Sequence, residues 1–482
     1  MQQVAGPDPR RWKALAVLGI AYLMVVLDVS IVNVALPSIQ KDLHFSTENL
    51  QWVVSGYALT FGGFLLLGGR AGDLLGRRRL FMAGLAFFSV ASLLCGLSVS
   101  SGMLIAMRLL QGAAGAVLSP SVFSITSVTF EEGTERNKAL GILGAIAGSG
   151  AAIGVMLGGV LTEYVGWEWI FFVNVPIGLG SLLLVPRVVR ESRADGLTQH
   201  FDAAGATTVT ASLMLFVFGL TQSTSHGWGS GTVVGSLIAS AVLMVAFFAI
   251  ESRSRSPLVP LTIFRRRTLF GANTIGFGLG TAVFGAFFLL SLYMQQVLGF
   301  SALKTGVGYL AIALSAVVAS GVSQAFVTRL GVKPVLSFGL AVMAGGLAYL
   351  SGVSAHGSYF GDLFAGFLLL GVGLGFSFVP VSIAALGGVD AHEAGLASGL
   401  INTSQQIGGA LGLAILVTVS TTRTNHLLDA GTARPEALVD GFGLAFWVAV
   451  GVAAAALGAT LALLKRQDLR ALRPEPVGAT SG

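Results

Sequence analysis

Long apolar stretches alternate with short polar connections along the whole chain. A helix needs about 20 apolar residues to cross the hydrocarbon core of a bilayer, and fourteen stretches have about that length or more. They predict an all-α polytopic membrane protein with 14 transmembrane helices. The predicted spans are residues 14–36, 51–69, 80–98, 103–127, 139–162, 169–186, 203–221, 230–250, 269–294, 305–328, 334–355, 363–388, 394–422 and 441–464.

The composition agrees with this pattern and excludes a soluble globular protein. Of the 482 residues, 54% are hydrophobic and only 10% are charged, whereas soluble domains carry about 25% charged residues. Twelve predicted spans contain no Asp, Glu, Lys or Arg, and the other two contain one each, Asp28 and Arg108. The single cysteine, Cys95, excludes an internal disulfide and a cysteine-based metal cluster. We expect neither a metal site nor a cofactor.

The distribution of basic residues predicts the orientation. With the N-terminus in the cytoplasm, inward segments hold 23 of the 28 Lys and Arg residues and outward segments hold four. Because basic residues stay on the cytoplasmic side, both tails, 1–13 and 465–482, are predicted to be cytoplasmic in a protein of the cell (plasma) membrane. Anionic lipid headgroups explain the net charge of +6 without nucleic acid as a partner. The four outward exceptions are Lys41, Lys304, Arg423 and Arg434.

An internal repeat divides the chain. When the sequence is shifted by 255 residues, the first five predicted spans fall on the ninth to thirteenth. The sixth pair aligns only if the outward connection 423–440 is an insertion of about 18 residues. Two parallel six-helix units are the layout of one class of alternating-access transporters. We therefore predict a six-helix unit in 14–186, a linker with two extra helices in 187–268, and a second six-helix unit in 269–464.

Asp28 is the only acidic residue within a predicted span. A charged carboxylate in the hydrocarbon costs ~2.5–3.5 kcal/mol even on a lenient insertion scale, so Asp28 is expected to face the bundle or a wet cavity. Burial favours the neutral form of a carboxyl group. Asp28 is therefore a candidate proton carrier, and the alternative is a structural carboxylate that hydrogen-bonds to a neighbouring helix.

Arg108 is the natural partner for Asp28, because both are expected at a similar depth in the outer half of the bilayer. Pairing would make it part of the proton-coupling site, whereas snorkelling to the outer interface is the alternative. Gln111 lies one turn further inward and can hydrogen-bond across helices. Asp28, Asn33 and Gln111 are candidate substrate-binding residues, although Asn33 lies about 140° round the helix from Asp28.

The inward connection 69–79 combines glycines, one acid and three consecutive arginines. Basic residues here are partly a topology signal, but the glycines also permit a sharp turn. Asp73 can accept hydrogen bonds from the arginines or cap the next helix. We expect a latch that holds one gate shut. The candidate gating residues are Gly69, Gly72, Asp73, Gly76, Arg77 and Arg78.

Glycines recur four residues apart in the fifth predicted span, beginning with Gly144 and Gly148. Glycines at this spacing lie on one helix face and let two backbones touch. Plain helix packing explains the pattern, and the functional alternative is a tight seal that opens and closes during transport. The candidate residues of this antiporter helix are Gly150, Gly154, Gly158 and Gly159.

Together these residues resemble the major facilitator superfamily, in particular its fourteen-helix drug:proton antiporter branch. The likeness extends over nearly all of 10–465, and the first span resembles the opening motif of the branch at Asp28, Asn33 and Pro37. Further segments similar to family motifs are Gly69 to Arg79, Arg108 with Gln111 and Gly112, Gly150 to Gly159, and Trp167 to Gly178.

The resemblance implies proton-driven export of small amphiphilic molecules by alternating access, as in multidrug and antibiotic efflux, with no cofactor and with the monomer as the working unit. Two positions depart from the family pattern. Val155 stands where the antiporter motif usually has proline, which puts a bend of that helix in doubt. Glu168 stands where arginine is common.

Other functions are weighed against this one. An uptake carrier of the same fold, coupled to protons or sodium, is the main alternative, and the direction of substrate movement distinguishes the two. A membrane enzyme is disfavoured because the longest connections have fewer than 20 residues. Single buried charges suit a carrier better than a channel ringed with charge. Nucleotide-driven export within this chain is excluded, because it has no G-x-x-x-x-G-K-[ST] loop.

Overall fold

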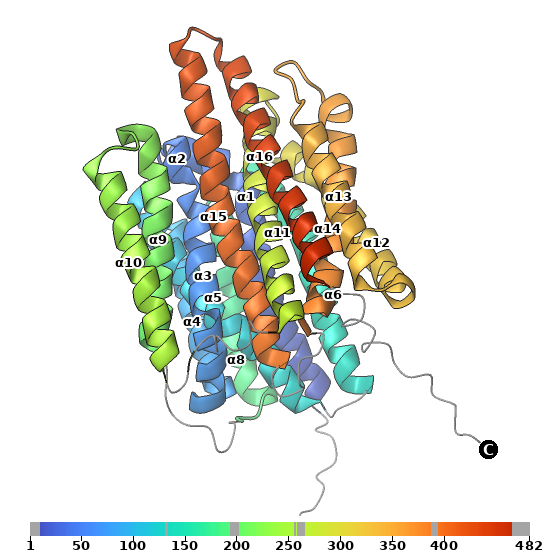
Figure 1. The fold of residues 1–482 in the computed structure, drawn as a ribbon. Coiled ribbons are helices and arrows are strands. Elements are labelled where there is room, and N and C mark those ends of the chain that lie inside the picture. Colours follow the sequence, from blue (N-terminus) through green and yellow to red (C-terminus); the bar gives the residue numbers. More distant parts are fainter. Residues whose placement is uncertain are drawn as a thin grey trace, which may run out of the picture.

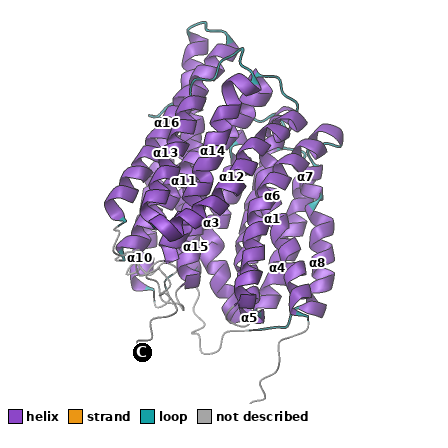
Figure 2. Ribbon diagram, turned by 90° about the vertical axis from the view of Figure 1, so that its right-hand side faces the viewer, coloured by secondary structure: helices purple, strands orange, loops and turns teal. Residues whose placement is uncertain are grey.

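A computed structural model of the chain describes residues 10–130, 134–192, 202–254, 257, 266–386 and 394–464. Every regular element in this part of the chain is a helix, as Figure 2 shows. The long helices are α1 (Arg11–Asp42), α3 (Trp52–Leu75), α4 (Arg77–Gly96), α5 (Ser101–Thr129), α6 (Thr134–Tyr164), α8 (Asn174–Val188), α9 (Ala203–His226), α10 (Gly231–Arg253), α11 (Arg267–Leu292), α12 (Ala302–Leu330), α13 (Val332–Leu350), α14 (Phe364–Leu386), α15 (Ala394–Asp429) and α16 (Arg434–Leu463). The short ones are α2 (Thr47–Leu50), α7 (Trp169–Phe172) and two π-helical segments, Tyr293–Val297 and Tyr359–Leu363.

The helices confirm the predicted all-α membrane fold. Within the described residues, thirteen helical segments are long and apolar enough to cross a membrane, with α7 and α8 counted as one. Helix α6, 31 residues long, coincides with the fifth predicted span. Each of the other predicted spans likewise coincides with a long helix, except 169–186, which is divided between α7 and α8.

The outward connection 423–440 is mostly helical. It is not a loop throughout, because α15 continues to Asp429 and α16 already begins at Arg434. The two extensions form a helical hairpin that stands above the rest of the bundle (Figure 1). An ion pair of 2.6 Å between Arg423 Nε and Asp440 Oδ1 joins them. The polar residues of 423–440 thus belong to helix ends that extend beyond the apolar spans.

The same helix pairs pack together in the two halves of the chain. In the first half α1 packs on α6 and α8, and α5 packs on α3 and α4. In the second half α11 packs on α15 and α16, and α14 packs on α12 and α13. A shift of 255 residues relates these pairs wherever the repeat aligns. This is the packing that two copies of one six-helix unit produce.

The extra helices α9 and α10 pack on each other at one side of the bundle (Figure 1). Helix α9 also contacts α3 of the first half and α15 of the second. Gln51 Nε2 donates to Thr221 Oγ1 at 2.9 Å, and Thr418 Oγ1 donates to the carbonyl oxygen of Leu220 at 3.3 Å. The pair therefore lies over the line along which α3 and α15 meet.

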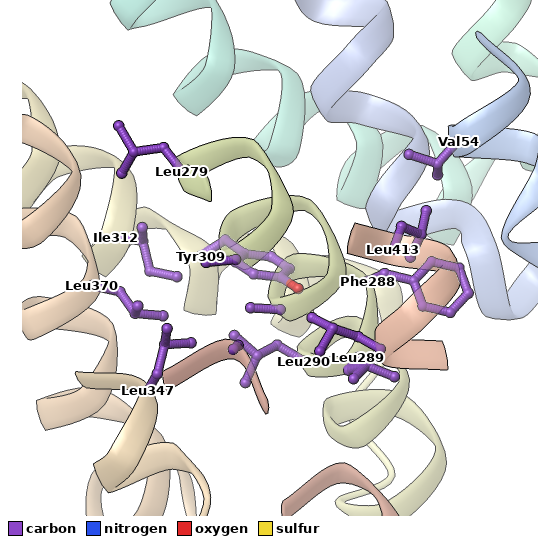
Figure 3. Close-up of a cluster of buried hydrophobic side chains, with 14 of the residues drawn as sticks. Val54, Leu279, Phe288, Leu289, Leu290, Tyr309, Ile312, Leu347, Leu370 and Leu413 are labelled. Atoms are coloured by element: carbon purple, nitrogen blue, oxygen red, sulfur yellow. The ribbon is translucent and has the colours of Figure 1, made fainter. Parts of the chain in front are cut away.

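Close packing of apolar side chains fills the second half. The ring of Tyr309 is stacked between those of Phe287 and Phe367, with centroid distances of 5.3 and 5.7 Å. Its hydroxyl donates to the carbonyl oxygen of Phe287 at 2.6 Å. Figure 3 shows this ring among leucine and isoleucine side chains. In a bilayer, van der Waals packing and interhelical hydrogen bonds of this kind hold helices together.

The two halves are hydrogen-bonded to each other near the C-terminal end of α1, which is the predicted outer end. Ser291 Oγ donates to the carbonyl oxygen of Asn33 at 2.6 Å, and Gln295 Nε2 donates to that of Val34 at 2.9 Å. Further along, Gln296 Nε2 donates to Gln40 Oε1 at 2.7 Å. These bonds close the outer end between α1 and α11.

Candidate functional site

Asp28 of α1 and Arg108 of α5 meet inside the first half. Arg108 Nη1 lies 2.6 Å from Asp28 Oδ2, and the side chains are 1% and 0% exposed, respectively. Arg108 therefore does not snorkel to the outer interface. A buried charge of either sign is costly unless it is paired and hydrogen-bonded, and this contact provides the pairing for both.

Gln111 completes the pair from the same face of α5, one turn from Arg108. Its Nε2 donates to Asp28 Oδ1 at 2.7 Å, and its Oε1 accepts from Arg108 Nη1 at 2.6 Å. The amide thus bonds to the anion with one end and to the cation with the other. Its Nε2 also donates to Ser92 Oγ of α4 at 2.7 Å.

Sequence reasoning missed Asn174 and Ser92 as members of this site. Asn174 opens α8 directly after the break that separates α7 from α8, and its Nδ2 donates to Asp28 Oδ1 at 2.9 Å. Its Oδ1 is buried and has no hydrogen-bond partner. The signals for Asn174 were an uncharged polar residue in an apolar span and its place in the family-like segment Trp167 to Gly178. We refer to Asp28, Ser92, Arg108, Gln111 and Asn174 as the charged cluster.

The rest of the guanidinium is enclosed by α3 and α7. Arg108 Nε donates to the carbonyl oxygen of Val53 at 2.8 Å. The Arg108 carbon Cζ lies 4.4 Å from the centroid of the Tyr57 ring and 5.7 Å from that of Phe171, which are cation–π distances. Cys95 Sγ donates to Gln111 Oε1 at 3.7 Å. All these groups belong to the first half, so the charged cluster lies within one six-helix unit and not between the two.

Asn33 does not join the charged cluster. Its Nδ2 donates to the carbonyl oxygen of Val29 in its own helix at 3.1 Å. Its own carbonyl oxygen accepts from Ser291, as described above, so Asn33 lies where the halves meet. The angular offset from Asp28 explains the separation, because residues five apart point to different sides of a helix.

The candidate gating segment is mostly helical rather than a loop. Helix α3 continues through Gly69, Gly72 and Asp73 to Leu75, and the turn is confined to Gly76 with a φ of 111°. A residue with a Cβ is strained at this φ. The side chain of Asp73 lies outside the described residues. The expected latch around Asp73 therefore stays a prediction.

Glu191, which follows α8, caps the helix that begins after Gly76. Its carboxylate accepts from the backbone N–H groups of Arg78 at 3.1 Å and Arg79 at 3.2 Å. The Nε atoms of both arginines lie 3.8 Å from Glu191 Oε2, and the carbonyl oxygen of Ser192 accepts from the N–H of Arg77 at 3.0 Å. The anion at the start of α4 is thus supplied by a residue more than 100 positions away, which local sequence reasoning could not identify.

The glycine ladder of α6 lies against α1. A Cβ added to Gly150 would lie 2.9 Å from Val26 Cγ1, and one added to Gly158 would lie 2.7 Å from the carbonyl oxygen of Ile31. A Cβ added to Gly154 would be crowded more severely still, by Ser30 Oγ. The side-chain surroundings of Gly144 and Gly148 lie outside the described residues.

The last glycine of the ladder faces the other half of the protein. A Cβ added to Gly159 would lie 2.9 Å from Leu303 Cα of α12. From the opposite side of the same contact, a Cβ added to Gly306 of α12 would lie 2.7 Å from the carbonyl oxygen of Val155 in α6. Helices α6 and α12 are therefore in backbone contact, and Val155 takes part without the usual proline.

No group of three or more His, Cys, Asp or Glu side chains that could hold a metal ion occurs among the described residues. The charged cluster offers one carboxylate, already occupied by three donors. Its chemistry is that of a buried, fully hydrogen-bonded carboxylate paired with a guanidinium.

Comparison with known proteins gives a consistent picture. The family model of the Major Facilitator Superfamily matches residues 18–413. The puromycin resistance protein pur8 of Streptomyces alboniger is 39% identical over 465 residues, which cover 95% of this chain and 91% of that protein. The cephamycin export protein CmcT of Amycolatopsis lactamdurans is 38% identical over 449 residues, which cover 91% of this chain and 89% of that one. The tetracenomycin C resistance and export protein of Streptomyces glaucescens is 34% identical, with 88% and 78% covered.

Solved structures share the fold at low sequence identity. A bacterial homolog of the human lysosomal transporter Spinster, crystallised in an inward-facing, unoccupied conformation, superposes with a TM-score of 0.65 at 16% identity, covering 98% of this chain and 100% of that one. The POT family transporter PepTSo gives a TM-score of 0.65 at 14% identity, with 93% and 98% covered.

Proposed function

Because the chain belongs to the Major Facilitator Superfamily, we propose that it exports small amphiphilic molecules, antibiotics among them, in exchange for protons by alternating access. The family match and the relatives make it a multi-pass membrane transporter of small molecules and not an enzyme. Relatives that align over most of both chains are named for resistance to puromycin or export of cephamycin. These names support export over uptake as the direction of transport.

The observation that carries proton coupling is the buried pair of Asp28 and Arg108. As a carboxylate, Asp28 neutralises Arg108 and accepts from Gln111 and Asn174. A proton on Asp28 removes the compensating charge and turns one acceptor oxygen into a donor. The unpartnered Oδ1 of Asn174 can then accept that proton's hydrogen bond if its amide rotates. Protonation therefore has to rearrange the cluster, which spans α1, α4, α5 and α8.

The rearrangement reaches the other half through α1. This helix carries Asp28 and, further along, the carbonyl groups of Asn33 and Val34 that accept from Ser291 and Gln295. A change in the position of α1 thus acts on the bonds that close the outer end. Alternating access requires these bonds to break when the outer end opens.

The proton gradient supplies enough energy for this exchange. One proton moving inward down 100 mV releases ~2.3 kcal/mol, and each pH unit adds about 1.4 kcal/mol. Together these amounts hold a gradient of about 500-fold in a neutral substrate for each proton. In this conformation Asp28 is completely buried, so it acts on the substrate site through the helices rather than by direct contact.

Transport by Asp28→Asn tests the proposal. In inside-out vesicles with an acidic lumen, the wild type should accumulate puromycin or another amphiphilic antibiotic against its gradient, whereas Asp28→Asn should only equilibrate it. Asp42→Asn is the matched control on the same helix, because Asp42 is exposed and its carboxylate accepts from Trp167 Nε1 at 2.9 Å outside the charged cluster. The double variant Asp28→Asn/Arg108→Gln leaves no unpaired buried charge and serves if the single variant folds poorly.

The outcomes are distinct. Full proton-driven accumulation by Asp28→Asn would remove Asp28 from the coupling mechanism. Accumulation in right-side-out vesicles instead of inside-out vesicles would identify an uptake carrier.

A further inference from the structure

A pocket with a volume of about 510 Å³ lies at the predicted outer end, between the two six-helix units. One wall comes from the end of α1, and the opposite wall comes from the π-helical segment after α11 and the first turns of α16. Its lining residues are Pro37, Gln40, Lys41, Gln296, Arg434, Pro435 and Leu438.

The pocket is basic in a region that otherwise has few basic residues. Of the four outward Lys and Arg residues, two interact with side chains outside this pocket. Lys304 Nζ lies 3.8 Å from the centroid of the Phe300 ring, and Arg423 is paired with Asp440. The other two, Lys41 and Arg434, both line this pocket.

Neither pocket cation has a counter-ion among the described residues. No acidic residue lines the pocket, and within the described part of the chain neither side chain makes an ion pair or a hydrogen bond. Both side chains are exposed, and two like charges that line one concave surface create a positive local potential. The chemistry that relieves this potential is an anion placed between them.

We propose that this pocket binds a phosphate-bearing anion, with Lys41 on one side and Arg434 on the other. The guanidinium fork matches two phosphate oxygens, and the ammonium group acts as a point charge. At the outer membrane surface this chemistry comes either from the headgroup of an anionic phospholipid or from free phosphate. The pocket is large enough for either, since ligand sites range from about 300 to 1,000 Å³.

The anion would bridge the two halves of the transporter. Lys41 belongs to the first unit and Arg434 to the second, and the neighbouring bond between Gln296 and Gln40 also crosses this boundary. When the outer end opens, the two cations move apart and the site is lost. A ligand that binds one conformation stabilises it, so the anion holds the outer end closed. This consequence for transport rests on the proposed alternating access, whereas binding itself does not.

The test compares two double variants that remove the same charge. Lys41→Gln/Arg434→Gln removes both pocket cations, and Lys304→Gln/Arg423→Gln removes the other two outward cations. Each cation that directly contacts the bound anion contributes about fivefold in affinity. The pocket variant should therefore bind about 30-fold more weakly, while the control should bind like the wild type.

The readout is the distance between labels on cysteines placed at Asn49 and Ala430, in a Cys95→Ser background. The full-length protein is placed in phosphatidylcholine nanodiscs, with or without phosphatidylglycerol, and with or without inorganic phosphate at constant ionic strength. In the wild type, one or both anions should shift the label-to-label distance to the value of the conformation in which the outer end is closed. A response to phosphatidylglycerol alone identifies the lipid headgroup, and a response to inorganic phosphate identifies the free anion.

Three results would contradict the proposed anion site. An identical response of the wild type and the pocket variant, a loss in both double variants, or no response of the wild type to either anion would reject the site. Asp28→Asn protein should still respond to the anion, because Asp28 lies outside the pocket. A failed proton-coupling proposal is therefore distinguishable from a failed anion site.

Discussion

Removing the charge of Asp28 should destabilise the protein because its two oxygens serve opposite sides of the charged cluster. Oδ1 accepts from Gln111 and Asn174, and Oδ2 accepts from Arg108. An asparagine has one oxygen and one NH2 group, so it can satisfy only one side. In Asp28→Asn, the NH2 group faces either the guanidinium or two amide donors.

The expected loss in free energy of unfolding follows from the burial of Arg108, which is 1% exposed. Breaking a buried ion pair by removing one partner costs ~3–5 kcal/mol, because the other charge stays buried and uncompensated. The bond to the Val53 carbonyl and the contact with Tyr57 keep Arg108 in place. Asp28→Asn/Arg108→Gln removes both charges and leaves amides that can bond to one another. We expect this double variant to recover about 3 kcal/mol relative to the sum of the single variants.

A double-mutant cycle measured by reversible unfolding of the purified protein checks this prediction. The matched control is the pair Arg423 and Asp440, which has the same separation of 2.6 Å but is 39% and 48% exposed. Its coupling energy should be much smaller than that of the buried pair, because solvent screens exposed charges. If the buried pair were additive within about 0.5 kcal/mol, the reasoning that Asp28 compensates a desolvated Arg108 would be refuted.

Two further predictions concern the helix contacts. Gly158→Ala should lower the free energy of unfolding by ~1–3 kcal/mol and slow transport, because the new Cβ would lie 2.7 Å from the Ile31 carbonyl oxygen. Gly141→Ala in the same helix meets no atom within 4 Å and should be neutral or slightly stabilising in the same unfolding assay, so equal losses would contradict the α1–α6 contact. Glu191→Gln should cost about 1 kcal/mol in thermal unfolding, because it weakens the cap of α4. Glu135→Gln, which removes the acid in the first turn of α6 and its pair with Arg11, should cost less, and the reverse order would contradict the capping role.

The charged cluster makes the two halves chemically unequal. The shift of 255 residues that relates their helices places Val283 opposite Asp28 and Leu363 opposite Arg108. The second half instead packs aromatic and aliphatic side chains around Tyr309 (Figure 3). If protons are coupled through the buried pair of Asp28 and Arg108, as proposed, the second half has to respond through its contacts with α1, such as those of Ser291 and Gln295.

The sequence by itself determined the helices and the two charges that matter. Span positions could be predicted because crossing a bilayer requires a certain length of apolar chain, which is a local property. Asp28 and Arg108 stood out because a charge in such a stretch needs a partner. The sequence also placed Gln111 beside Arg108, since residues three apart share a helix face. The sequence did not show that most of 423–440 is helical, because polar residues beyond the membrane can continue a helix as well as form a loop.

Only the tertiary structure decided which distant residues complete each site. Asn174 lies 146 residues from Asp28 and Glu191 lies 113 residues from Arg78, so no local pattern relates them. The tertiary structure also separated Asn33 from the charged cluster and brought Lys41 and Arg434 to one pocket. The physical reason is that hydrophobicity fixes how deep a residue lies in the membrane, whereas the rotation and pairing of helices fix what it touches.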